Sequence, residues 1–138
     1  MIARAAILAG AVLAGCSQSA DGGFSGCGGV SGGLPDSAFV IATQPVAGEQ
    51  VESAFEVRGC SRTFESTVNW ELRGRDGAVL DSGFTSGGGA DGPAAFAFTV
   101  AYEIDERQIG TLDVFEVDAS DGEGFPPGRT VLPLVLRP

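Results

Sequence analysis

The 138-residue sequence contains no histidine and no lysine, and all eight of its basic residues are arginines. The absence of histidine excludes Ser-His-Asp and Cys-His catalysis and removes the commonest zinc ligand. Eighteen acidic residues against eight basic ones give a formal net charge of −10. Nucleic-acid binding and docking on anionic lipid through a polybasic patch both need a basic surface. Composition therefore argues against a classical hydrolase and against nucleic acid as a partner.

Long hydrophobic runs are scarce, and the one at the N-terminus spans only residues 5–14. Ten residues are too few to cross a hydrocarbon core of about 30 Å as a helix, which needs roughly 20. A basic start at Arg4, a short apolar run and small residues before a break are typical of a secretory signal. The break, Leu13-Ala14-Gly15-Cys16, resembles a bacterial lipobox. The resemblance implies acylation of Cys16 and cleavage before it; the alternative is an ordinary signal peptide with an incidental cysteine.

Several acyl chains on one residue satisfy the two-signal rule for stable membrane anchoring. We therefore expect an extracytoplasmic protein that is held to the lipid bilayer through Cys16. Ser17 follows the cysteine. In a Gram-negative organism this position lacks the Asp associated with inner-membrane retention, which favours the outer membrane.

Residues 17–37 hold seven glycines and five serines, a composition typical of a flexible tether. The predicted organisation is a signal peptide at 1–15, the lipidated cysteine and tether at 16–37, and one domain at 38–138. Lipidation of Cys16 leaves Cys27 and Cys60 as an even pair in an oxidising compartment, so we expect a disulfide between them. Two free thiols, or an intermolecular bridge through Cys27, are the alternatives.

The domain alternates apolar and polar residues in short segments that are separated by turn signals. No segment carries a 3.6-residue helical stripe of useful length, so we predict an all-β fold. About seven strands in 100 residues indicate an immunoglobulin-like sandwich of two antiparallel sheets. Trp70, Phe96 and Phe98 are the expected core residues, and Leu80 and Phe84 are the apolar residues of the fourth strand. The predicted strands are Ala38–Thr43, Val51–Arg58, Thr67–Arg73, Ala78–Thr85, Ala94–Tyr102, Gly110–Asp118 and Arg129–Arg137.

An ordered set of strand and turn marks between Phe39 and Leu136 resembles the immunoglobulin-like domain of bacterial spore germination proteins. The marks are Ile41, Pro45-Val46-Ala47-Gly48, Val51, Val57-Arg58-Gly59, Phe64-Glu65, Val68-Asn69-Trp70-Glu71-Leu72, Asp76-Gly77, Phe96, Phe98, Phe115-Glu116-Val117 and Ser120-Asp121-Gly122. The resemblance implies a binding or interaction module, carried by secreted and membrane-anchored bacterial proteins, whose ligand is undefined. Cys60 departs from the pattern, because a small residue such as Ala is expected after Gly59.

The acidic turn at 118–123 is the only metal-site candidate that the sequence suggests. Asp118, Asp121 and Glu123 supply three carboxylates, and Ca²⁺ prefers oxygen ligands in loops. The spacing does not match an EF-hand, and a solvated acidic turn is the simpler interpretation. Two cysteines without histidine make a zinc site improbable. We expect no cofactor.

Three classes of function remain open. The first is a lipid-anchored, non-catalytic module that binds an envelope protein. The second is a structural lipoprotein that binds peptidoglycan or polysaccharide, and the third is a small enzyme that uses a pair of carboxylates. A sandwich of this size offers little concave volume for catalysis, and its serines lack a base. The sequence therefore favours the first class. Exposed aromatic side chains on one face would favour the second, and an uncovered edge strand would favour a protein partner.

Overall fold

The computed structural model describes residue 27 and residues 37–119, 121–123 and 126–138. These residues form strands and connecting loops, with no helix among them and hence none that could cross a membrane. The predicted signal peptide, Cys16 and most of the predicted tether lie outside the described residues. The strands are β1 (Phe39–Gln44), β2 (Gln50–Val51), β3 (Phe55–Arg62), β4 (Thr67–Arg73), β5 (Val79–Ser86), β6 (Ala94–Val100), β7 (Gln108–Phe115) and β8 (Arg129–Leu136).

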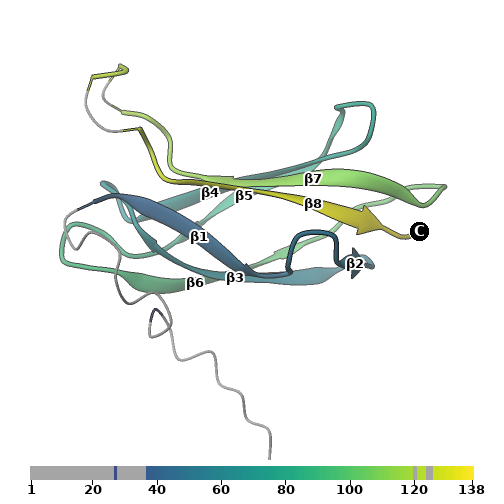
Figure 1. Cartoon of the computed structure of the whole chain (residues 1–138), viewed down its shortest axis with the longest axis horizontal. Helices are drawn as coiled ribbons and strands as arrows, with labels where there is room; N and C mark the ends of the chain where they lie inside the picture. The colour runs from purple at the N-terminus through teal and green to yellow at the C-terminus, as the bar shows by residue number, and fades with distance from the viewer. Residues whose placement is uncertain (1–26, 28–36, 120, 124–125) are drawn as a thin grey trace, which may run out of the picture.

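The strands form two sheets that pack face to face, as Figure 1 shows. One sheet has three strands in the order β1-β3-β6, and the other has five in the order β2-β8-β7-β4-β5. Every pairing is antiparallel except that of β2 with β8. The predicted all-β sandwich of two sheets is therefore confirmed.

The predicted strand Val51–Arg58 is wrong in one respect, because the chain divides it between the two sheets. Val51 pairs with Leu136 in the five-stranded sheet, whereas Phe55 pairs with Val100 in the three-stranded sheet. The residues between β2 and β3 carry the chain from one layer to the other. Period-two alternation is the same in both layers, so it could not reveal this crossing.

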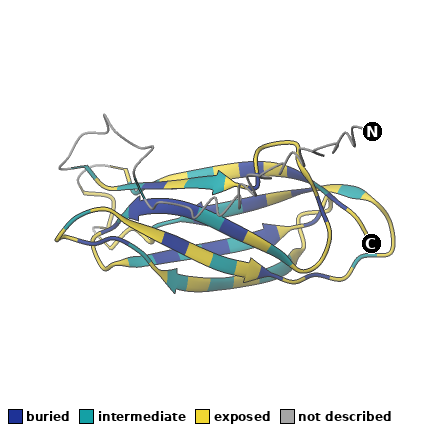
Figure 2. Cartoon of the chain, turned by 90° about the horizontal axis from the view of Figure 1, so that it is seen from below, coloured by how far each residue is buried: buried dark blue, intermediate teal, exposed yellow. Residues whose placement is uncertain are grey.

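The core lies between the sheets, and Figure 2 shows buried and exposed residues alternating along the strands. Trp70 on β4 is 7% exposed, and its indole stacks on the ring of Phe98, with centroids 4.9 Å apart. Phe96 is buried beside Phe98 on β6. A Cβ atom on Gly83 would lie 2.8 Å from Cζ2 of Trp70. Gly83 therefore gives the indole the space in which it packs.

Phe84, one of the two apolar residues of the predicted fourth strand, does not join this core. The register pairs Trp70 with Gly83 on the inner face and Asn69 with Phe84 on the outer face. Phe84 is consequently 76% exposed, while Leu80 packs against the core in part. The edge position of β5 explains the exposure, because only β4 adjoins this strand within the sheet.

Candidate functional site

A groove opens at one end of the five-stranded sheet, between the β3–β4 loop and the chain that connects β7 to β8. Its cavity volume is about 510 Å³, within the range of ordinary ligand pockets. The outer face of β4 supplies Thr67 and Asn69. In Figure 1 the β7–β8 connection extends beyond the sheets at this end. The lining residues are Ala38, Phe64, Glu65, Thr67, Asn69, Glu116, Val117, Asp118, Ala119, Glu123 and Pro127.

Phe64 lies at the tip of the β3–β4 loop and is 80% exposed. The loop is anchored at both of its ends. The backbone amide of Thr63 donates to the carbonyl of Gly88 (2.9 Å), and the amide of Gly87 donates to the carbonyl of Ser66 (2.9 Å). Ser66 adopts a left-handed conformation with φ 56°, which turns the chain into β4. The exposed ring is therefore presented by a loop of defined shape.

Glu116 joins the two sides of the groove. Its carboxylate accepts a hydrogen bond from the backbone amide of Phe64, 52 residues away along the chain. The amide of Glu116 donates to the carbonyl of Gly128 (3.0 Å), so Glu116 is also fixed to the far end of the β7–β8 connection. Val117, the next residue, is 59% exposed. Phe64 and Val117 are thus the apolar lining residues nearest this link.

Carboxylates dominate the polar lining. Glu65, Glu116, Asp118 and Glu123 all line the groove, and no arginine is among the lining residues. Arg129, at the start of β8, forms an ion pair with Asp113. A lining with four carboxylates and no arginine gives this end of the domain a negative potential.

The groove combines an exposed aromatic ring with carboxylates and uncharged polar side chains. The sequence offers no histidine to activate a nucleophile. Asp118 and Glu123 contribute to the lining, but Asp121 does not. Among the described residues, no group of three or more acidic or cysteine side chains is arranged to hold a metal ion, so the predicted calcium candidates Asp118, Asp121 and Glu123 do not come together.

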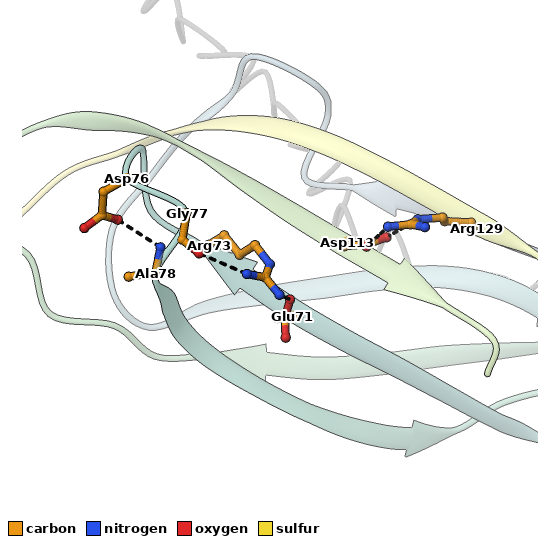
Figure 3. A network of polar contacts seen from close by, with 7 residues as sticks. All are labelled: Glu71, Arg73, Asp76, Gly77, Ala78, Asp113 and Arg129. Carbon is orange, nitrogen blue, oxygen red and sulfur yellow. Dashed lines mark hydrogen bonds and ion pairs between the residues drawn. The ribbon is translucent and has the colours of Figure 1, made fainter.

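A second polar cluster lies on the same outer face, and Figure 3 shows it. Glu71 on β4 and Asp113 on β7 are direct cross-strand partners. Like charges in such positions repel, but each carboxylate is neutralised by an arginine. Arg73 forms an ion pair with Glu71 and donates to the carbonyl of Gly77 (2.9 Å).

Arg129 completes this cluster by donating from Nε to Asp113 (2.8 Å). The hydrogen bonds that Arg129 donates to the Asp113 carboxylate raise the pKa of its guanidinium above the ordinary value. Both carboxylates are thus paired with arginines of the same sheet. We interpret the cluster as one that holds the sheet together.

Cys27 and Cys60 form a disulfide in the structure, with Cα atoms 5.2 Å apart. That separation lies within the usual range for a disulfide. Val57, Gly59 and Ser61 of β3 are buried between the sheets, so alternation along the strand places Cys60 on the outer face of the three-stranded sheet. The bridge therefore joins the tether to the layer that does not carry the groove.

The free edges of the three-stranded sheet are covered by side chains of the other sheet. The hydroxyl of Thr130 donates to the carbonyl of Val40 (2.7 Å) and accepts from the amide of Ala42 (3.2 Å), both on β1. On β6, the carbonyl of Ala97 accepts from the hydroxyl of Thr85 (3.2 Å). These contacts occupy ladder positions that an added strand would need. Strand addition to this sheet is therefore disfavoured.

A shallower hollow lies at the opposite end of the five-stranded sheet. Its lining includes Arg75, Arg107 and Ile109, and Ile109 is 64% exposed. The length of β7 separates the two hollows by roughly 24 Å. One end of this sheet is therefore acidic and the other carries arginines.

Sequence analysis did not identify the groove. Phe64 and Glu116 are far apart in sequence, and each had served only as a mark of the family pattern. One feature of the sequence could have indicated the groove. Phe64 lies between two predicted strands, where a large aromatic residue has no core position to fill. Only the acidic turn was noticed, as a candidate metal site rather than as one wall of a groove.

Comparison with known families places most of the domain in a described family. The model of a family described as the immunoglobulin-like domain of bacterial spore germination matches residues 39–123. The matched region runs from β1 through β7 and includes all of the groove lining except Ala38 and Pro127. The search of curated proteins found no match.

Proposed function

The chain belongs to the family of immunoglobulin-like domains of bacterial spore germination, and we propose that it is a lipid-anchored extracytoplasmic protein whose domain binds an envelope protein. The family has no known catalytic role, and its members are modules associated with spore germination. Membership by itself names no partner for this chain. The proposal of a binding role rests on the groove.

The observation that carries the proposal is the position of Phe64. A ring that is 80% exposed has a favourable free energy of transfer out of water. Here the loop that carries it is fixed by hydrogen bonds to Gly88 and Glu116, and the ring borders a concave surface. Aromatic side chains that are held rigidly beside a pocket are typical anchors of protein interfaces. A protein that covers Phe64 and Val117 would bury apolar surface with little loss of conformational entropy, because the loop is already fixed.

The anchor would set the direction in which the groove faces. Lipidation of Cys16 would place the membrane attachment 11 residues before Cys27. A flexible segment of that length has a root-mean-square span of about 18 Å. Since Cys27 is bridged to the outer face of the three-stranded sheet, that layer would lie nearer the membrane. The groove, on the five-stranded sheet, would then face away from the lipid and toward other envelope components.

Binding of peptidoglycan or polysaccharide is a second candidate. Phe64 offers a flat apolar surface on which a sugar ring could stack. Thr67 and Asn69 supply hydroxyl and amide groups nearby, and carboxylates could accept hydrogen bonds from sugar hydroxyls. We rank this candidate second because four carboxylates in the lining disfavour the acidic peptide groups of a cell wall.

Photo-crosslinking of the full anchored chain in cells tests the proposal. A photoreactive residue replaces Val117 in the groove, and in a control chain it replaces Ile109 at the opposite end, which is exposed to a similar extent. Crosslinked protein is identified by mass spectrometry, and muropeptides are assayed in the same samples. One dominant envelope protein that is captured from position 117 and not from 109 is the expected result. Enrichment of wall fragments without a protein would overturn the proposal in favour of the second candidate.

A further inference from the structure

We infer that the groove binds a basic segment of its partner protein, in which a Lys or Arg side chain lies along Phe64 and its charged end meets the carboxylates. This inference rests on the proposed function and names the chemistry of the partner. It follows from the charge, the apolar lining and the polar floor of the groove.

Charge is the first argument. Glu65, Glu116, Asp118 and Glu123 line one cavity without an arginine among its lining residues. Most of the described arginines form ion pairs with carboxylates outside the groove. These pairs are Arg58–Glu56, Arg73–Glu71, Arg75–Glu106, Arg129–Asp113 and Arg137–Glu52. A Lys or Arg side chain of the ligand would supply a positive charge that complements this acidic lining.

The apolar lining is the second argument. A small inorganic cation could pair with the carboxylates but would leave the apolar side chains of the groove exposed to water. Phe64 is 80% exposed and Val117 is 59% exposed. A Lys or Arg side chain has a methylene stem that packs on apolar surface and a charged end that stays hydrated or paired. The same charged end also interacts favourably with the face of an aromatic ring. One such side chain therefore matches both features of the groove.

The floor is the third argument, because it suits an extended peptide rather than a lone amino acid. Thr67 and Asn69 project from the outer face of β4, and both line the groove. An asparagine amide can donate to a peptide carbonyl and accept from a peptide amide. A cavity of about 510 Å³ has room for several side chains. The groove thus fits a short stretch of chain with a basic residue at its centre.

Two charge-neutralised chains test the inference, each with the photoreactive residue at position 117. One carries Glu65→Gln and Glu123→Gln in the groove. The matched control carries Glu103→Gln and Asp105→Asn in the β6–β7 connection, at the other end of the sheet. Both change the formal net charge from −10 to −8. Thermal unfolding of the purified chains checks that all of them fold.

We expect the crosslink yield to fall at least about fivefold in the groove variant and to stay unchanged in the control. The crosslinked partner peptide should contain Lys or Arg near the site of attachment, and the yield should fall as ionic strength rises. A partner peptide without a basic residue, or equal yields from the two variants, would overturn the inference while leaving a protein-binding module. Crosslinks between two copies of this chain would overturn the inference of a separate partner protein. The segment in the groove would then be the end of a second copy that carries Arg107. Capture of glycan alone would overturn both the inference and the proposed function.

Discussion

The backbone amide of Phe64 and the carboxylate of Glu116 are joined by a hydrogen bond that closes the β3–β4 loop against the β7–β8 connection. The two residues are 52 positions apart in the sequence. Each of the two segments has a second hydrogen bond that fixes it. The amide of Thr63, next to Phe64, donates to the carbonyl of Gly88, and the amide of Glu116 donates to the carbonyl of Gly128. The groove is therefore an assembled feature of this fold, made by loops that the two sheets bring to the same end.

Replacing Trp70 by Ala should lower the free energy of unfolding by about 3–5 kcal/mol. The change removes the stack on Phe98 and leaves a cavity between the sheets. Trp70→Phe should cost less, because a ring remains and because Nε1 of Trp70 has no hydrogen-bond partner within the described part of the chain. Denaturant unfolding followed by circular dichroism measures both variants. An unchanged midpoint for Trp70→Ala would mean that the register of β4 is wrong.

The stability of the domain should fall in alkaline solution because of Tyr102, the only tyrosine. Burial raises the pKa of its phenol above the ordinary value near 10, and its hydroxyl lies 2.7 Å from the carbonyl of Val51 and 2.9 Å from that of Arg137. The neutral phenol is thus favoured in the folded state. Its contribution is fully present below the pKa of the unfolded chain and is lost as pH rises through the folded pKa.

Tyr102→Phe is the matched variant for this prediction. It should lower the free energy of unfolding near neutral pH by about 1–2 kcal/mol, because buried carbonyl groups lose a donor. The tyrosine-dependent part of the alkaline decline should disappear. Ultraviolet absorbance of the phenolate reports the titration of this single residue directly. A midpoint at the ordinary pKa of tyrosine would contradict the burial of Tyr102.

Loss of the Cys27–Cys60 bridge should destabilise the domain. The bridge joins residues 33 positions apart, and on the chain-entropy model its removal costs about 3–4 kcal/mol. The double variant Cys27→Ala and Cys60→Ala leaves Cys16 intact and is compared with the parent chain by thermal unfolding. Peptide mapping of the parent without reductant should recover the linked pair. Recovery of free thiols at both positions would contradict the pairing.

Acylation of Cys16 is predicted from sequence alone. Cys16→Ser should abolish incorporation of labelled fatty acid and release the protein from the membrane fraction, since the remaining apolar run at 5–14 is too short to span a bilayer. The Cys27→Ser chain serves as the control, because it should still be labelled. Membrane retention of Cys16→Ser after signal cleavage would show that the anchor lies elsewhere.

The fold was predictable because a strand in either layer of a sandwich buries one face and exposes the other, which gives its sequence a period-two alternation. Thr67–Arg73 is found as predicted, since Val68, Trp70 and Leu72 share one face. Sequence patterning failed where tertiary context decides the outcome. Phe84 has the hydrophobicity of a core residue, yet the pairing of Trp70 with Gly83 sends it to the outer face.

The candidate site was less predictable than the fold. Asp118 and Glu123 drew attention as oxygen ligands because charges close together in sequence are easy to notice. Their role depends on Phe64 and Asn69, which come from a different loop and a different strand. No local sequence pattern indicates that these residues lie close together. They do so only because β4 and β7 pair within one sheet.

The most direct test of the groove as the interaction site is the crosslink yield from position 117 in Phe64→Ser, compared with that in Ile109→Ser. Both changes remove a large exposed apolar side chain, one at each end of the five-stranded sheet. Neither residue belongs to the core, so each should change the free energy of unfolding by less than about 1 kcal/mol. The account predicts that Phe64→Ser loses most of the crosslinked partner while Ile109→Ser keeps it. Equal yields from the two variants would contradict the account.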